Sequence, residues 1–195
     1  MFISDQLIFI HIPKTGGNSI RNLLLKNIKG QKYNPTHFTY DQAVQAIPEI
    51  SLKKSFCIVR NPFDRFVSLY RFICRNHRLR KWFGENFLQI KEDINTMEKF
   101  IDNFVMPDQA FSGHNHFTQQ ITWANNVQHI FKLEEPSSIM KFLSEFGIND
   151  QLPHLNSREI PSYEDNLYRS YYNQRTKNII QEKFKDDLQK FKYEF

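Results

Sequence analysis

Two short segments of the chain are almost wholly apolar, and each is followed by apolar residues at helical spacing. The first segment covers residues 7–12 and is rich in isoleucine, and from Ser19 the apolar side chains recur three or four positions apart. Short apolar runs are typical of strands buried on both faces of a parallel sheet, and the spacing that follows is typical of an amphipathic helix. We predict a strand, a turn at Gly16 and Gly17, and a helix that stops at Gly30, a residue suited to the left-handed position after a helix.

The same order of elements recurs further along the chain. Residues 55–59 (SFCIV) form the second apolar run, and from Phe63 apolar side chains again repeat at helical spacing. Asn61 suits the cap of this second helix and Pro62 suits its first turn. Arg60 is therefore expected at the carboxyl end of a strand, where open α/β sheets bind ligands.

Length and composition agree with one globular domain. The 195 residues are 40% hydrophobic and 24% charged, and a chain of this length buries about 70% of the surface that it exposes when unfolded. We predict an α/β fold, a P-loop-like and mainly parallel sheet flanked by helices, in a single domain over residues 1–195. Cys57 and Cys74 are expected to be buried thiols rather than a disulfide or a metal pair.

Net charge and targeting signals bear on the ligands and the cellular location of the protein. The net charge of +5 favours anionic ligands in general without choosing among them. No apolar stretch is long enough to span a membrane, and the first residues lack the pattern of a signal peptide. We therefore expect a cytoplasmic protein without a transmembrane segment, and peripheral association with a membrane remains open.

The turn after the first strand carries groups that bind anions. Lys14 supplies a positive charge, and Thr15, Asn18 and Ser19 supply hydrogen-bond donors. At such a junction the N–H groups of the helix's first turn point at one spot, and glycine lets the main chain approach a ligand. The lysine precedes the glycines, unlike in the nucleoside triphosphate motif G-x-x-x-x-G-K-[ST], so a shorter cradle is expected. A tight turn with a solvated lysine is the alternative.

Arg60 and Ser68 form a second candidate anion site. An arginine fork with a nearby hydroxyl suits a terminal phosphate monoester. Pairing of Arg60 with Asp41 or Asp64 is the alternative. Two anion sites at the ends of two parallel strands predict a ligand that carries phosphates at two places.

These ordered motifs, HIPKTGGNSI and FCIVRNPFDRFVSLYRF, resemble the sulfotransferases, especially the carbohydrate group that includes heparan and chondroitin sulfotransferases and bacterial relatives. Residues 116–120 (HFTQQ) look like the family's His-x-x-x-Gln segment, and residues 130–134 (IFKLE) like its late strand. Residues 152–157 (LPHLNS) look like a loop near the cofactor, and residues 164–195 like the closing helix and tail. Residues 76–115 are expected to be a variable insertion on the acceptor side.

The resemblance implies 3′-phosphoadenosine 5′-phosphosulfate (PAPS) as the sulfuryl donor, leaving as adenosine 3′,5′-bisphosphate, with no metal. It implies that Arg60 and Ser68 hold the 3′-phosphate and that Arg158 touches the cofactor. The 5′-phosphosulfate is expected in the first loop, on Lys14, Thr15, Gly16, Gly17, Asn18 and Ser19.

His37 is the candidate catalytic base. It lies in THFTYDQ, between the two cofactor motifs, and this segment resembles the part of the family that carries the catalytic histidine. An imidazole that titrates near pH 6.5 is partly neutral at working pH, and a positioned base contributes about 10² to 10⁴ in rate. Lys14 is then expected to be the second catalytic residue, as the cation that faces the leaving group. A helix-capping role for His37 near Asp41 is the alternative.

The acceptor is expected to be a hydroxyl of a saccharide or polysaccharide, contacted by His116, Gln120 and Glu134. Glu134 could instead pair with Lys14 or Arg60. His114 and His116 lack a third ligand at zinc spacing, so no metal site is expected.

Two other functions compete with sulfuryl transfer. A nucleotide-dependent kinase or other phosphotransferase would need the lysine-after-glycine order and a magnesium-binding pair, neither of which is apparent. A basic nucleic-acid-binding module would leave both strand-end motifs unexplained, so no nucleic-acid partner is expected.

Overall fold

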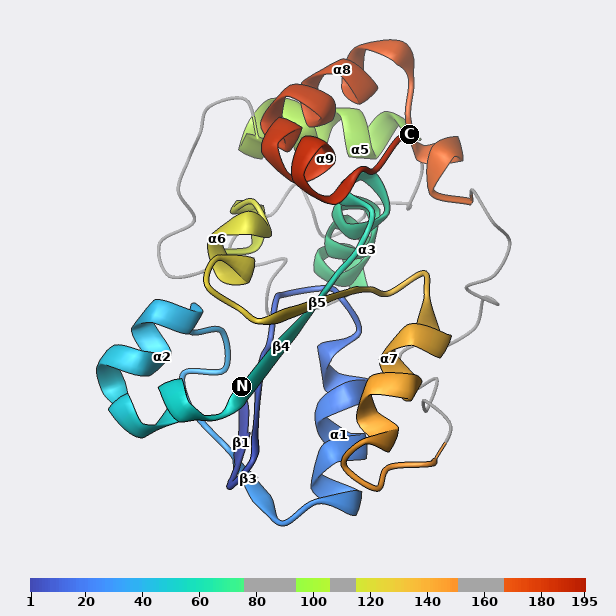
Figure 1. The fold of residues 1–195 in the computed structure, drawn as a ribbon. Coiled ribbons are helices and arrows are strands. Elements are labelled where there is room, and N and C mark those ends of the chain that lie inside the picture. Colours follow the sequence, from blue (N-terminus) through green and yellow to red (C-terminus); the bar gives the residue numbers. More distant parts are fainter. Residues whose placement is uncertain (76–93, 106–114, 151–166) are drawn as a thin grey trace. The chain divides into compact units, whose positions relative to one another are not determined.

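A computed structural model describes residues 1–75, 94–105, 115–150 and 167–195 (Figure 1). Contacts divide the chain into two compact units, one made of residues 1–60 and 120–162 and the other of residues 61–119 and 163–195. The expectation of one domain stays a prediction. Among the described residues, no helix is long and apolar enough to cross a membrane.

The first unit is built on a mixed sheet of five strands in the order β3-β1-β2-β4-β5. β2 pairs in parallel with β4, and β4 pairs in parallel with β5, whereas β1 is antiparallel to both of its neighbours. The α/β prediction of a mainly parallel sheet flanked by helices is confirmed. The strands are β1 Phe2–Ser4, β2 Leu7–Ile10, β3 Gly30–Lys32, β4 Lys54–Val59 and β5 His129–Lys132.

Helices cover the sheet of the first unit. Figure 1 shows α1 (Gly17–Asn27) and α7 (Pro136–Ser144) on one side of the sheet and α2 (Tyr40–Ala46) on the other. Alternate side chains of the central strands point toward α1 and α7, so apolar residues of β2, β4 and these helices share one core. This core includes Leu7, Phe9, Phe56, Ile58, Ile20, Leu24, Ile139 and Phe142. The first unit also contains a 3₁₀ helix, η1 (Pro48–Leu52), and the short α6 (Ile121–Ala124).

The described secondary-structure elements of the second unit are helices. The predicted helix after Asn61 is α3 (Pro62–Arg75), and the Asn61 Oδ1 accepts from the Phe63 N–H at 3.0 Å, which confirms the predicted cap. Aromatic side chains dominate its core, where Phe66, Tyr70, Phe100 and Phe184 are buried. The other elements are α5 Ile94–Phe100, a π-helical turn η4 Ile101–Val105, η5 Asn115–Phe117, η6 Leu167–Tyr171, α8 Gln174–Lys183 and α9 Lys185–Phe191.

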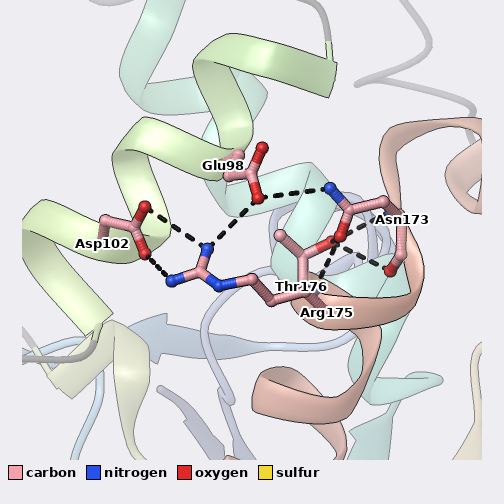
Figure 2. A network of polar contacts seen from close by, with 5 residues as sticks. All are labelled: Glu98, Asp102, Asn173, Arg175 and Thr176. Atoms are coloured by element: carbon pink, nitrogen blue, oxygen red, sulfur yellow. Dashed lines mark hydrogen bonds and ion pairs between the residues drawn. The ribbon is translucent and has the colours of Figure 1, made fainter.

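A polar network joins the start of α8 to α5 and η4 (Figure 2). The Arg175 guanidinium bonds to Glu98 at 3.2 Å and to Asp102 at 2.6 Å. Asn173 and Thr176 cap α8 reciprocally, since the Asn173 Oδ1 accepts from the Thr176 N–H and the Thr176 Oγ1 accepts from the Asn173 N–H. Exposed ion pairs add little stability individually, so we assign this network mainly to orientation of the α8 terminus.

Gly30 does not take the predicted left-handed conformation. The helix ends at Asn27 with Ile28 extended, and Gly30 begins β3. A Cβ at Gly30 would lie 2.6 Å from the carbonyl oxygen of Ile3. Glycine is therefore needed for the close approach of β3 to β1, and the prediction of a helix-terminating turn was wrong.

The two cysteines are buried and unbridged, as predicted. Cys57 lies in β4 and Cys74 in α3. Burial raises the pKa of the Cys57 thiol, which keeps it protonated and unreactive.

Candidate functional site

The loop after β2 turns sharply into α1. Lys14 and Gly16 both have left-handed backbones, with φ of 69° and 76°. The Gly16 carbonyl accepts from the N–H groups of Ser19 at 3.0 Å and Ile20 at 3.3 Å. Gly17 and Asn18 precede Ser19 in the first turn of α1, and N–H groups at such positions point away from the helix and are suited to an anion.

Side chains of this loop divide between those that hold it and those at its surface. Thr15 is buried, and its hydroxyl donates to the Ile12 carbonyl at 3.0 Å, which ties the loop to the end of β2. Asn18 is exposed, and its Oδ1 accepts from the Arg21 Nη2 at 2.8 Å. Ser19 is half-buried in the first turn of α1.

Two cations meet at the carboxyl ends of β2 and β4. Arg60 follows β4 directly, and its Nη1 donates to the main-chain oxygen of Lys14 at 3.3 Å. Burial, and then the charge of Arg60, lower the pKa of Lys14 to about 8. Like charges held close together in a partly dehydrated site repel each other, so an anion placed beside both would relieve the repulsion.

His37 lies in the segment before α2, with its ring in a defined orientation. Its Nδ1 is bonded to the main-chain oxygen of His11 at 2.8 Å. Because a carbonyl oxygen only accepts, we assign the ring proton to Nδ1, which leaves Nε2 as the proton acceptor of the neutral ring. The cap of α2 is Thr39, whose Oγ1 accepts from the Gln42 N–H at 3.2 Å, so the alternative in which His37 caps this helix is wrong.

His11 packs between β2, the first loop and His37. It is 5% exposed, its ring stacks on Phe9 with centroids 5.8 Å apart, and its centroid lies 4.6 Å from that of His37. A Cβ at Gly17 would overlap the His11 ring. The second glycine of the loop is therefore required by the imidazole behind it.

Gln120, the residue before α6, and Trp123, within α6, hold main-chain atoms of Arg60 and His37, and the sequence did not reveal these contacts. The Gln120 Oε1 accepts from the Arg60 N–H at 2.9 Å, and its Nε2 donates to the Arg60 carbonyl at 2.8 Å. The Trp123 indole N–H donates to the His37 carbonyl at 2.9 Å. The predicted contact of Gln120 with the acceptor stays a prediction, but its amide is buried against Arg60. No local spacing signals pairings between residues so far apart in the chain.

The remaining predicted residues lie elsewhere. Glu134 is exposed just beyond β5, which is parallel to β4. Ser68 on α3 and His116 on η5 belong to the second unit, where Arg65 donates to the His116 carbonyl at 3.1 Å. Arg158 lies outside the described residues, as do residues 76–93 and 106–114 of the expected insertion. In the first unit, Arg60 thus contacts the main chain of Lys14, and His37 contacts that of His11.

The described residues contain no group of three His, Cys, Asp or Glu side chains able to hold a metal ion.

Neither the curated proteins nor the solved structures yielded a similar chain. A family model described as the sulfotransferase family matches residues 1–194, nearly the whole chain and both of its units. The chain therefore belongs to the sulfotransferase family.

Proposed function

We propose that the protein transfers the sulfuryl group of PAPS to a hydroxyl of a saccharide or polysaccharide. Its family supports a transferase of sulfuryl groups. One observation supports the choice of PAPS as donor. Arg60 contacts the main chain of Lys14 where the parallel strands β2 and β4 end, so two cationic residues lie at the same edge of the sheet.

The residues present fit a donor of this kind. The loop from Lys14 to Ser19 combines a cation, a helix N-terminus and two glycines, and this set suits a phosphosulfate. Arg60 suits the 3′-phosphate, together with Ser68 and Arg158. When bound, PAPS supplies a sulfuryl group attached to a phosphate leaving group.

Two side chains carry the proposed chemistry. His37 takes the proton of the acceptor hydroxyl on Nε2, because Nδ1 is held by the His11 carbonyl. Lys14 stabilises the negative charge that develops on the phosphate oxygen. Its pKa of about 8 leaves the ammonium mostly protonated at neutral pH. His116 and Glu134 remain the proposed contacts of the acceptor.

Thermal unfolding tests the choice of donor. Adenosine 3′,5′-bisphosphate at about 100 times its Kd should stabilise the fold by about 2.7 kcal/mol, a Tm shift of about 5–10 °C. ATP with magnesium should shift the Tm less. Lys14→Gln and Arg60→Gln should each abolish the shift, and Ser68→Ala should reduce it. A larger shift with ATP and magnesium would contradict the proposal and favour a phosphotransferase.

Transfer of sulfur-labelled PAPS to a panel of saccharides tests the base. His37→Asn keeps a side-chain N–H that can reach the His11 carbonyl but has no basic nitrogen, so it is a matched variant. It should keep the Tm shift with the bisphosphate and lose about 10² to 10⁴ in transfer rate. Full activity in His37→Asn would refute the base assignment.

A further inference from the structure

We propose that Gln120 and Trp123 are positioning residues, which hold Arg60 and His37 in one arrangement from a single helical turn. This inference rests on the proposed function, in which Arg60 binds a phosphate and His37 accepts a proton. Neither residue needs to touch the reacting groups, because each acts on the main chain of its partner.

Gln120 acts on Arg60 as a neighbouring strand would. The last ladder pair between β4 and β5 joins Val59 and Lys132, and Arg60 follows it. Both main-chain groups of Arg60 are bonded by the Gln120 amide, at 2.9 and 2.8 Å. A backbone N–H only donates and a carbonyl only accepts, so the buried amide has a single suitable orientation.

Burial makes this pairing costly to lose. Gln120 has no exposed surface, and a buried main-chain group that loses its partner is strongly penalised. Arg60 is therefore fixed at its backbone, and its guanidinium extends from there to the carbonyl of Lys14.

Trp123 fixes the segment that carries the base. The indole is fully buried and donates to the His37 carbonyl at 2.9 Å. The His37 ring is bonded separately through Nδ1 to the His11 carbonyl. The residue is thus held at its main chain and at its ring, which determines where Nε2 lies.

The two contacts are joined through one turn of main chain. The Trp123 N–H donates to the Gln120 carbonyl at 3.0 Å, so the residues form the start of α6. A shift of this turn would displace Arg60 and His37 together. The structure therefore couples the proposed phosphate anchor to the proposed base without direct contact between their side chains being required.

Measurements on the protein without donor test the Gln120 contact. Gln120→Met has similar size but no amide, and the matched control is Gln128→Met, because the Gln128 Oε1 accepts from the Ser55 N–H at the other end of β4. Lysine side-chain NMR should show the pKa of Lys14 rising from about 8 in Arg60→Met and in Gln120→Met, since Arg60 helps to lower it. Gln128→Met should leave this pKa unchanged.

A Lys14 pKa that rises in Arg60→Met but not in Gln120→Met would overturn the assignment. Gln120→Asn serves if the methionine variant does not fold. It keeps the amide but is one methylene too short to reach both groups of Arg60, so it should also raise the pKa of Lys14.

Trp123→Phe tests the other half of the turn, because it removes the indole N–H and keeps an aromatic ring. Imidazole nitrogen NMR should show a smaller fraction of the Nδ1–H form of His37 in this variant and no change in Gln128→Met. With labelled PAPS, kcat should fall about tenfold while bisphosphate affinity stays within about twofold, as expected for a displaced base beside an intact anion site. Gln120→Met should instead weaken the affinity about tenfold.

The outcomes separate this inference from the proposed function. A wild-type protein that neither binds the bisphosphate nor uses PAPS would refute the function, while the two NMR measurements would still decide the positioning roles. Unchanged NMR signals in Gln120→Met and Trp123→Phe would refute the positioning roles even in an active sulfotransferase.

Discussion

Lys14 is the residue whose ionisation should most affect binding. Burial, followed by the charge of Arg60, lowers its pKa from 10.5 to about 8. Between these two pH values the unfolded chain holds a proton that the folded protein has released. The free energy of unfolding should therefore rise with pH in this window as far as Lys14 contributes. An anion bound beside Lys14 favours the charged form and raises its pKa again.

The affinity for adenosine 3′,5′-bisphosphate should therefore fall above about pH 8, by up to about tenfold per pH unit, because Lys14 must regain a proton on binding. Calorimetric titration at a series of pH values measures this dependence. Lys14→Arg stays charged throughout the window and should give a flat profile. Identical profiles for the two proteins would show that Lys14 does not contact the bound anion.

At the scale of residues, the sequence was enough to single out Lys14, Arg60 and His37, but not the residues that hold their main chains in place. Lys14 and Arg60 were predicted because they follow apolar runs that had to be strands, and His37 because its segment resembles the family's. Gln120 and Trp123 contact Arg60 and His37 through main-chain atoms, which carry no sequence-specific pattern. Such contacts depend on how distant segments meet in the folded chain.

At the scale of elements, burial decided which strands could be predicted. β2 and β4 were predicted to within two residues, because apart from exposed Lys54 all of their residues are buried. β1 and β3 were missed because each has three residues, and all three of β3 are exposed. A strand at a sheet edge with no apolar face leaves no periodicity to recognise.

The junction between β2 and α1 offers a test of packing. A Cβ at Gly17 would overlap the His11 ring, so Gly17→Ala should lower the free energy of unfolding by about 1–3 kcal/mol, the usual cost of overpacking. The same substitution in a His11→Ala background should cost less than about 0.5 kcal/mol, because the ring that it meets is gone. Chemical denaturation of the four proteins measures this coupling. Equal costs in the two backgrounds would place the strain elsewhere.

At the scale of the whole molecule, the family match covers more of the chain than the unit that contains the proposed site residues. The match spans residues 1–194, whereas Lys14, His37 and Arg60 all belong to the first unit. These three residues could be predicted from the sequence because the proposed donor loop and base require residue types that stand out in it, and their roles stay proposals. Acceptor recognition imposes no common residue pattern on the family. The acceptor contacts of His116 and Glu134 therefore stay predictions.

Whole-molecule charge provides the last test, because a net charge of +5 could attract an anionic nucleotide without any dedicated site. Lys29, beyond the carboxyl end of α1, and Lys54, at the start of β4, are exposed, and replacing both by glutamine lowers the net charge from +5 to +3. At about 0.15 M salt the Debye length is about 8 Å, so charges far from the ligand are screened. The double variant should bind adenosine 3′,5′-bisphosphate within about twofold of wild type, whereas Lys14→Gln, which removes one charge, should abolish binding. Equal losses in the two proteins would mean that the overall field binds the anion, and salt-sensitive retention on DNA would then favour the nucleic-acid-binding alternative.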